Sequence, residues 1–406
     1  SINISMSHKS VVLFYKYFIE EESLLSPSAL ERIQQCIHDV CARFELKGRI
    51  LLASEGINGT LSASSKNDLD EFIQLMEAYR DDNIISVDEK ESERRECGEY
   101  QSKMPTSIPI SPTSICRGKW RNAPLCSKDL SSLFHGIDWK FSHVDEASEL
   151  AQRNRQPFPD LKISIVKEIV SSGGSVRVDE ISKYGGKHLT PMEFHQTLLH
   201  GGWVTEDEEF NFSNPRSSCD DNQGTRSKRK QLVVIDVRNT FEYNIGHFRN
   251  GNRCKIEKAI NPEMVTFSSF DTKFCAENAD YLKDKKVLMY CTGGIRCEKA
   301  SIMLRKRGVD DVSQLSGGIH RYMEEFPNGF FHGKNFVFDQ RVALVAGENE
   351  NKETRKTIVG KCLECNDSYD EISGSRICSV CRDLVLVCPK CVAQLREYHC
   401  ERHQAW

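Results

Sequence analysis

The feature that most restricts how this chain can fold is a cysteine-rich segment near its C-terminal end. The chain has 17 cysteines in 406 residues, and seven of them fall between Cys362 and Cys400. Pairs of candidate ligands separated by two residues recur four times: Cys362 and Cys365, Cys378 and Cys381, Cys388 and Cys391, Cys400 and His403. Each pair puts two soft ligands on one tight turn, and tetrahedral zinc needs two such pairs. So short a segment buries too little apolar surface to fold without a metal.

Eight ligands predict two closed zinc sites, and both are structural because four protein ligands leave no position for water. Consecutive pairing would join the first ligand pair to the second and the third to the fourth. Interleaved pairing would join the first to the third and the second to the fourth, and the spacing does not choose between them. His399 is a spare candidate ligand. Buried or redox-active cysteines that fall at this spacing by chance are the less favoured interpretation.

The length and composition predict a soluble protein of several domains. A chain of 406 residues exceeds what one hydrophobic core normally organises. Its 39% hydrophobic and 28% charged residues exclude wholesale disorder. With 55 basic and 59 acidic residues the net charge is −4, which argues against binding nucleic acid by bulk positive charge but allows a local basic face.

The cysteines are expected to be reduced. The sequence opens without a signal-peptide pattern, and it contains no apolar run approaching the roughly 18 residues of a membrane span. We therefore expect an intracellular protein, cytoplasmic in the first place, with no membrane partner. Because the chain starts at Ser1, a plastid or mitochondrion stays open if a targeting peptide has been removed.

The N-terminal part has the pattern of an α+β domain over residues 11–170. Strand-like runs at 11–18, 49–54 and 60–63 alternate with helical patterns at 27–44 and 65–79, in the order βαββα. Asn58-Gly59 between two strand-like runs predicts a hairpin turn. With further strands at 139–143 and 161–169, this order predicts a ferredoxin-like fold. Residues 81–137 lack any period and are interpreted as an insertion.

A second folded unit is predicted at residues 231–344, after a connector over 171–230. The connector includes a short helix at 191–200 and ends in a basic run at 226–230, for which a solvated linker is favoured over nuclear import or RNA contact. Buried-type strands at 232–235 and 287–290 and a helix at 297–307 predict a parallel α/β sheet. The zinc module occupies residues 360–406.

The decisive local feature is a six-residue loop between the strand at 287–290 and the following helix. It begins with Cys291 and continues with Thr292, Gly293, Gly294, Ile295 and Arg296. Two glycines let the backbone N–H groups turn inward, and with the helix N-terminus they form an anion-binding cradle around the Cys291 sulfur. This field lowers the thiol pKa and favours a thiolate nucleophile, and Arg296 adds a positive charge. Cys297 could be a resolving thiol or a packed side chain, and the sequence favours neither interpretation over the other.

Several motifs together resemble a rhodanese domain. They are Ile235-Asp236-Val237-Arg238, Glu242-Tyr243, Gly246-His247 and the loop at 291–296. A six-residue loop resembles the sulfurtransferase class, which holds a persulfide, whereas the related phosphatases have a longer loop. Asp236 could brace the loop and Arg238 could pair with an acid such as Glu242, and for both a structural role is favoured. His247 could act as a base, but a hydrogen-bonded structural role is favoured.

Longer stretches are similar to the tRNA uridine hydroxylase (UPF0176) family: residues 47–60, 167–170, 291–301 and 336–339. This resemblance implies a ferredoxin-like domain before a rhodanese domain, tRNA as partner, and oxygen-dependent 5-hydroxylation of the wobble uridine with Cys291 as the essential thiol. Residues 81–137, 250–258 and those beyond 344 are absent from the family pattern.

Two other functions are compatible with these motifs. In a plain sulfurtransferase, Cys291 would take sulfur from a small donor such as thiosulfate and pass it on through a persulfide. In a non-catalytic scaffold, the rhodanese domain beside the zinc module would only bind partners. The zinc module itself could bind tRNA or a protein partner, or only brace the enzyme, and contact with protein or RNA is favoured. The intact Cys291 loop argues against the scaffold. The sequence identifies no cofactor for catalysis.

Overall fold

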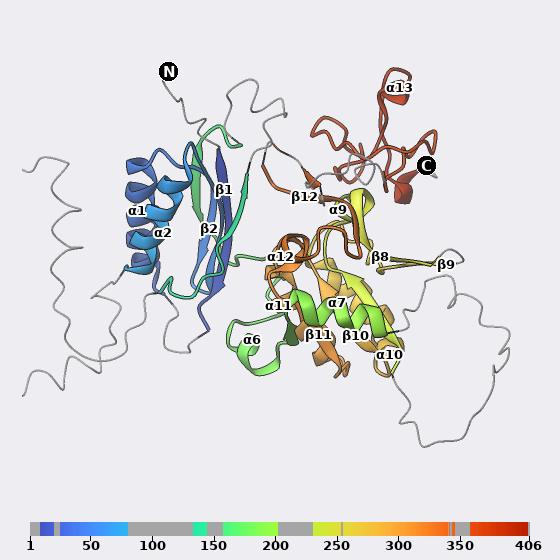
Figure 1. Cartoon of the computed structure of the whole chain (residues 1–406), viewed down its shortest axis with the longest axis horizontal. Helices are drawn as coiled ribbons and strands as arrows, with labels where there is room; N and C mark the ends of the chain where they lie inside the picture. The colour runs from blue at the N-terminus through green and yellow to red at the C-terminus, as the bar shows by residue number, and fades with distance from the viewer. Residues whose placement is uncertain are drawn as a thin grey trace, which may run out of the picture. The chain divides into compact units, whose positions relative to one another are not determined.

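A computed structural model describes residues 9–19, 25–79, 133–143, 157–201, 230–252, 255–339, 341, 343–345 and 358–404. The chain divides into two compact units, Ser1–Ile169 and Val170–Trp406 (Figure 1). Most of the predicted insertion, residues 81–132, and residues 226–229 of the basic run lie outside the described residues. Among the helices that are described, none combines the length and apolar character needed to cross a bilayer.

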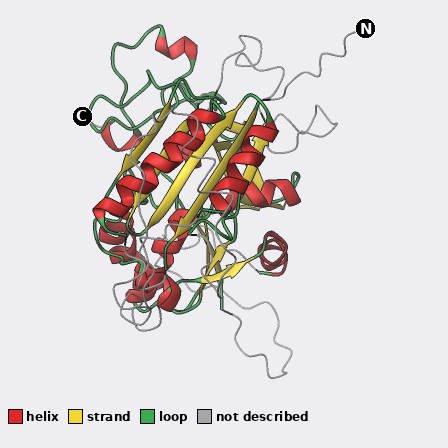
Figure 2. Cartoon of the chain, turned by 90° about the vertical axis from the view of Figure 1, so that its left-hand side faces the viewer, coloured by secondary structure: helices red, strands yellow, loops and turns green. Residues whose placement is uncertain are grey.

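The first unit is a five-stranded sheet covered by two helices on one face (Figure 1, Figure 2). The strand order is β4-β1-β3-β2-β5, and β5 is the only strand of this described sheet that runs parallel to its neighbour. The elements are β1 (Ser10–Tyr17), α1 (Pro27–Arg43), β2 (Lys47–Ala53), β3 (Gly56–Ala63), α2 (Lys66–Glu77), β4 (Lys140–His143) and β5 (Leu161–Ile165). The predicted α+β ferredoxin-like fold is confirmed.

The position of α1 follows from its sequence. The Ser26 side chain accepts a hydrogen bond from the Ala29 N–H at 3.2 Å, and Pro27 occupies the first helical turn, where it displaces no internal hydrogen bond. The buried side chains recur at helical spacing and join the core of the sheet: Leu30, Ile33, Ile37 and Val40. Burying each such side chain contributes roughly 1.5–3 kcal/mol.

The predicted hairpin turn at Asn58-Gly59 is wrong. β2 and β3 are joined by a two-residue turn at Ser54-Glu55, and Asn58-Gly59 lies within β3. A Cβ on Gly59 would come within 2.5 Å of the Phe14 ring. The glycine is therefore required by close packing inside the sheet, which a local turn signal cannot distinguish from a turn.

The second unit contains a four-stranded parallel sheet in the order β6-β11-β10-β7. Its strands are β6 (Lys187–Leu189), β7 (Leu232–Asp236), β10 (Lys286–Tyr290) and β11 (Val312–Leu315). Its helices are α6 (Asp179–Tyr184), α7 (Pro191–His200), α9 (Thr240–Ile245), η2 (Phe270–Cys275), α10 (Ala276–Leu282), α11 (Ile295–Lys306) and α12 (Gly318–Glu325). The predicted parallel α/β fold is confirmed.

The stretch predicted only as a connector contributes to this fold. β6, within residues 171–230, forms the edge of the parallel sheet next to β11. A three-residue strand is too short to leave a periodic pattern in the sequence. The residues around 250–258 form part of a second sheet with order β13-β12-β8-β9, made of β8 (Gly246–Asn252), β9 (Lys255–Lys258), β12 (Phe331–Phe336) and β13 (Ala343–Val345).

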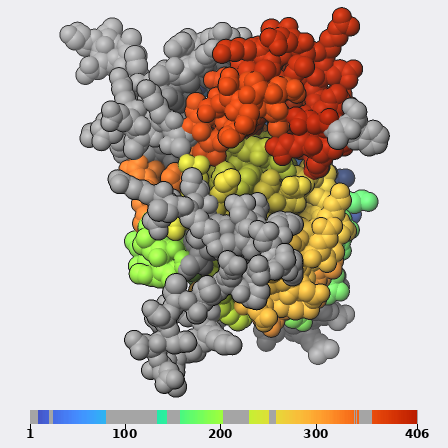
Figure 3. Space-filling model, turned by 90° about the vertical axis from the view of Figure 1, so that its right-hand side faces the viewer, coloured from blue at the N-terminus to red at the C-terminus, as the bar shows by residue number. Residues whose placement is uncertain are grey.

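The described C-terminal segment, residues 358–404, contains little regular structure. It has one short helix, α13 (Pro389–Val392), a 3-10 turn, η4 (Glu401–His403), and isolated β-bridges. Cysteine side chains dominate its buried cluster. This module, red in Figure 3, packs on the rest of the second unit. A separate apolar cluster that includes residues of α9 and β12 lies at the contact.

Candidate active site and metal module

Cys291 lies directly after β10, where the carboxyl end of the central parallel strand meets the N-terminus of α11. Its side chain is fully buried. The Gly294 N–H donates a hydrogen bond to the Cys291 Sγ at 3.1 Å. Gly294 has φ +103°, a left-handed conformation that favours glycine. The backbone therefore curls around the sulfur in the cradle that the sequence suggests.

The surroundings of Cys291 stabilise the thiolate. Burial alone would raise the pKa of this thiol, because desolvation disfavours the charged form. The hydrogen bond from the Cys297 thiol, the Arg296 charge, and the backbone N–H groups of Arg296 and Cys297 outweigh burial and lower the pKa to about 6. Cys291 is therefore mainly a thiolate at neutral pH.

The other side of the loop is held by α12. The N–H groups of Ile319 and His320 donate to the carbonyl oxygens of Cys291 and Thr292, at 3.0 and 3.1 Å. Because these carbonyls are held outside the cradle, the N–H groups of the loop face the sulfur. Gly318 makes this approach possible, since a Cβ there would lie 2.5 Å from the Cys291 oxygen. The Gly317-Gly318 pair is the sequence signal that could have identified this contact.

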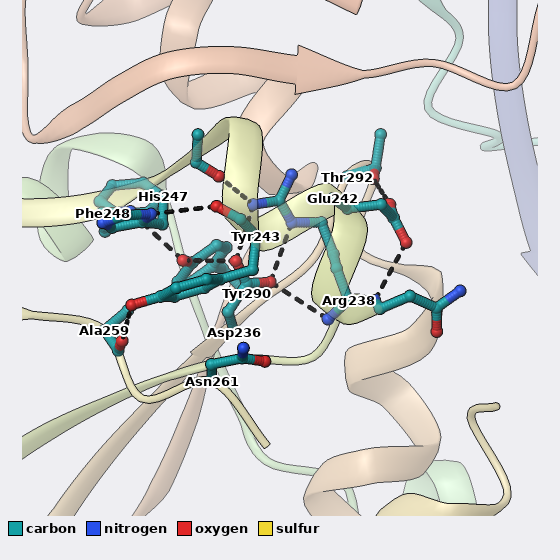
Figure 4. Close-up of polar contacts among 12 residues, drawn as sticks. Asp236, Arg238, Glu242, Tyr243, His247, Phe248, Ala259, Asn261, Tyr290 and Thr292 are labelled. Carbon is teal, nitrogen blue, oxygen red and sulfur yellow. Dashed lines mark hydrogen bonds and ion pairs between the residues drawn. The ribbon is translucent and has the colours of Figure 1, made fainter. Parts of the chain in front are cut away.

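Arg296 pairs with Glu242, the acid that the sequence suggests for Arg238. Its guanidinium binds both carboxylate oxygens of Glu242, at 2.7 and 2.8 Å. The Thr292 hydroxyl donates to the same carboxylate at 3.2 Å (Figure 4). The predicted pairing of Arg238 with Glu242 is wrong, because α9 directs Glu242 toward the loop. Glu242 is fully buried, and although burial alone would raise the pKa of its carboxyl, Arg296 holds it below its ordinary value.

Arg238 instead pairs with Asp236. Its guanidinium makes two hydrogen bonds to that carboxylate, at 2.9 and 2.7 Å, and both side chains are fully buried (Figure 4). The Tyr290 hydroxyl also donates to Asp236 at 2.7 Å. Since Tyr290 immediately precedes Cys291, Asp236 braces the strand that carries the loop.

His247 is held in a structural environment. Its Nδ1 lies 3.0 Å from the Tyr243 carbonyl oxygen, and its ring stacks on the Tyr243 ring with centroids 4.2 Å apart (Figure 4). Burial lowers the pKa of the imidazole to about 3, so the ring is neutral at physiological pH. These contacts favour the structural role over that of a base.

Cys297 lies in the first turn of α11 and is fully buried. Its thiol donates a hydrogen bond to Cys291, and burial together with the neighbouring thiolate raises its pKa well above the ordinary value. Cys297 is therefore a protonated thiol adjacent to the Cys291 thiolate. Of the other loop residues, Gly293 is buried, whereas Ile295 and Arg296 retain some exposure.

The structure selects the interleaved arrangement of the C-terminal ligands. One group consists of Cys362, Cys365, Cys388 and Cys391, and the other of Cys378, Cys381, Cys400 and His403. Within each group all four ligand atoms lie within 4.8 Å of one another. Such compact sets of four soft ligands could each hold a metal ion, and the chemistry fits zinc. The spare candidate His399 lies outside both groups, with its Nε2 3.1 Å from the Ser379 hydroxyl.

The turns that carry the ligands have the geometry of metal knuckles. Asn366 and Arg382, which directly follow the second cysteine of their pairs, adopt left-handed φ values of 61° and 66°. Their N–H groups donate to the carbonyl oxygens of Cys362 and Cys378. Each of these two cysteine pairs is therefore closed into a tight turn.

Three family profiles match the chain. The UPF0176 acylphosphatase like domain matches residues 9–108, the Rhodanese-like domain residues 222–325, and the Rhodanase C-terminal profile residues 332–403. The second profile covers Cys291 and its loop, and the third covers all eight candidate metal ligands.

Curated relatives match the chain over different lengths. "Rhodanese-like domain-containing protein 6" of Arabidopsis thaliana is 36% identical over 274 residues, which cover 66% of this chain and 41% of that protein. The chain thus spans less than half of that relative. "tRNA uridine(34) hydroxylase" of Corynebacterium glutamicum is 27% identical over 403 residues, 98% of this chain and 94% of its own length. The protein of the same name from an Arthrobacter species is 28% identical over 399 residues, which cover 97% of this chain and 98% of that protein.

Proposed function

We propose that this chain is a rhodanese-family thiol enzyme that hydroxylates a tRNA uridine. Two findings support the proposal: the chain joins a UPF0176 N-terminal domain to a rhodanese domain, and it resembles tRNA uridine(34) hydroxylases over nearly its whole length. It would act as an oxidoreductase on carbon 5 of the wobble uridine. The observation that carries the proposal is the Cys291 thiolate, held by the Gly294 N–H in a loop of six residues.

An exposed aromatic side chain next to the loop supports a nucleobase substrate. Phe338 is 59% exposed, and the Arg296 guanidinium carbon lies 5.9 Å from its ring centroid. The Phe336 ring meets it edge to face at 5.0 Å. Proteins commonly hold unstacked RNA bases on such aromatic faces. A uracil stacked on Phe338 would lie beside Arg296, the last residue of the loop.

Hydroxylation with molecular oxygen requires two electrons besides those that uridine supplies. Replacing the C5 hydrogen by a hydroxyl uses one oxygen atom, and the second atom must leave as water with two electrons and two protons. The Cys291 thiolate and the Cys297 thiol can provide both electrons and one proton by forming one disulfide, and the second proton, which the thiolate has already released, comes from water. Uridine, oxygen and two thiols then give 5-hydroxyuridine, water and a disulfide, so atoms and electrons balance. Their adjacent positions support this role for Cys297.

We further propose that the metal in both C-terminal groups is zinc. Seven thiolates and one imidazole are soft or borderline ligands, which zinc accepts in tetrahedral sites. When bound, zinc would supply structural cross-links, since four protein ligands leave no open position for catalysis. Native mass spectrometry that detects two zinc ions, both removed by chelation, would support this assignment, and a different metal would overturn it.

The decisive experiment is nucleoside analysis of tRNA from cells that lack the protein. We expect 5-hydroxyuridine and its derivatives to fall and to be restored by the wild-type chain but not by Cys291→Ser. If Cys297 supplies electrons, Cys297→Ser also fails to restore them, and a disulfide between the two cysteines accumulates after a single turnover without reductant. Unchanged 5-hydroxyuridine derivatives in cells that lack the protein would exclude the proposal.

A plain sulfurtransferase is the second candidate, and the N–H contact to the sulfur favours it as well. The same cradle would stabilise a persulfide on Cys291. Incubation with thiosulfate followed by mass spectrometry should then add one sulfur atom, about 32 Da, to the peptide that contains Cys291. If the wild-type chain gains this mass while tRNA hydroxylation is unaffected by Cys291→Ser, the sulfurtransferase is the better assignment.

A further inference from the structure

The short helix α9 has two faces with different tasks. On one face, Glu242 binds Arg296 and accepts a hydrogen bond from the Thr292 hydroxyl. Arg296 and Thr292 both belong to the Cys291 loop. On the other face, Phe241 and Ile245 belong to an apolar cluster with residues of the metal module. A helix of six residues is not stable by itself, so its position depends on what packs against it.

The segment 383–387 of the module supplies two side chains to this contact with α9. Its side chains alternate between two clusters, as expected for an extended chain. Leu384 and Leu386 lie in the cluster that contains Phe241 and Ile245 of α9. Val385 and Val387 instead point into the core of the module, among the cysteines.

The two metal groups hold this segment at both of its ends. Cys381 of one group lies two residues before it, and Cys388 of the other group follows it directly. Had consecutive pairs of ligands shared a metal, the segment would have linked two independent lobes. In the interleaved arrangement the lobes are entwined, so the segment is fixed between two ligand clusters that share one core.

Polar contacts add to the attachment of the module. The Arg402 guanidinium donates to the Glu263 carbonyl oxygen at 2.9 Å, and the Lys334 ammonium lies 2.8 Å from the Asp370 carboxylate. Arg402 also lies between the ligands Cys400 and His403 in the sequence. The second metal group is thereby tied to the loop before η2 as well as to α9.

We propose that the metal module is a positioning element for the active site: metal binding fixes the segment 383–387 against α9, and α9 then fixes Glu242 on the Cys291 loop. Leu386 is the central positioning residue of this path. The inference rests on the proposed metal binding and on Cys291 as the reactive thiol, but it holds for hydroxylation and for sulfur transfer alike. Loss of metal would loosen α9, displace Glu242 and Arg296, and so weaken the thiolate.

The test compares Leu386→Ala with Leu199→Ala in the full-length, metal-loaded protein. Leu386 is 2% exposed and contacts α9, whereas Leu199 on α7 is 57% exposed, so the control makes the same chemical change at the surface. The readout is the pH at which alkylation of Cys291 by iodoacetamide reaches half its maximal rate, followed by peptide mass spectrometry. This midpoint reports the thiol pKa, whereas the rate alone also reports access to a buried sulfur.

We expect the midpoint of the wild type and of Leu199→Ala to lie near pH 6. In Leu386→Ala and in the chelated wild type it should rise above about pH 7, toward the value of an ordinary thiol near 8.5. Metal content is measured in parallel. If Leu386→Ala retains two metal ions and the same midpoint as the control, the coupling is overturned while the metal assignment stands.

Chelation provides an independent arm if Leu386→Ala does not fold. If the chelated chain keeps its helical circular dichroism signal and a Cys291 alkylation midpoint near pH 6, the coupling is also overturned. A protein that binds no metal as prepared or after zinc is added overturns both the coupling and the metal assignment. Recovery of the low midpoint when zinc is restored supports the inference.

Discussion

Because Gly318 lies in close contact with the Cys291 loop, we expect one added methyl group at this position to destabilise the second unit strongly. In Gly318→Ala the new Cβ would lie 2.5 Å from the Cys291 carbonyl oxygen and 2.7 Å from both the Thr292 oxygen and the Gly294 nitrogen. All three atoms belong to the backbone, so no side chain can rotate away. The residue also has φ +65°, which disfavours any side chain.

The expected loss of stability has two parts. An alanine in the left-handed region costs roughly 1–2 kcal/mol. To relieve the contact, the loop must separate from α12, which breaks the hydrogen bonds from Ile319 and His320 and costs roughly 0.5–1.5 kcal/mol for each. The second unit should therefore lose about 2–5 kcal/mol in total. The pKa of Cys291 should also rise, because the cradle is distorted.

Gly174→Ala is the matched control. Gly174 has φ +77°, but nothing lies within 4 Å of its Cβ position. It therefore carries the conformational cost of roughly 1–2 kcal/mol without the steric contact. Unfolding of the second unit can be followed in urea by labelling of the buried Cys275, and the pKa of Cys291 by the pH dependence of its alkylation. Equal unfolding midpoints and equal Cys291 pKa values in both variants would refute the reasoning.

Three further predictions test the charges and the ligands. The rate of Cys291 alkylation should rise through a midpoint near pH 6, and a midpoint near pH 8.5 would contradict this prediction. Because the pKa of Cys291 in the folded protein lies below that of an unfolded thiol, the thiolate stabilises the fold fully above about pH 8.5, and this stabilisation is lost as the pH falls through 6. Glu242→Gln leaves the buried guanidinium of the loop without its anion and should lower the free energy of unfolding by about 3 kcal/mol in urea titrations, whereas an unchanged value would show that the pair is not needed. Cys362→Ser combined with Cys388→Ser should leave one bound metal ion in native mass spectrometry, and combined with Cys378→Ser none; the opposite result would indicate consecutive pairing.

The sequence identifies the parts of the site that are contiguous along the chain. The loop from Cys291 to Cys297, its strand and its helix are all local, so the pattern of an apolar strand, two glycines and a helix is sufficient. The ferredoxin-like and parallel α/β folds follow from the same kind of regular pattern over longer segments. The ligand spacing likewise indicates two metal sites.

What the sequence does not reveal are contacts between distant segments. Glu242 and Arg296 are 54 residues apart, and nothing local to Arg238 shows that it turns toward Asp236 instead. Gly318 supports the loop from a helix beyond the next strand. The pairing of metal ligands has the same origin, since spacing restricts each turn but not which turns meet. These features depend on which distant segments pack together, and the local pattern of a single sequence does not show that.

The charge balance around Cys291 argues against a phosphatase-like use of this loop. A guanidinium that binds a phosphate needs its two parallel donors free, but those of Arg296 are both engaged by Glu242. Asp236 and Arg238 form a second neutral pair. With Cys291 as a thiolate, these five described groups sum to one negative charge, so a phosphate dianion would meet repulsion rather than a net positive site. A sulfur atom on Cys291, or an uncharged base and oxygen, face no such penalty, which fits both candidate reactions. The choice between the two reactions then depends on whether Cys297 supplies electrons.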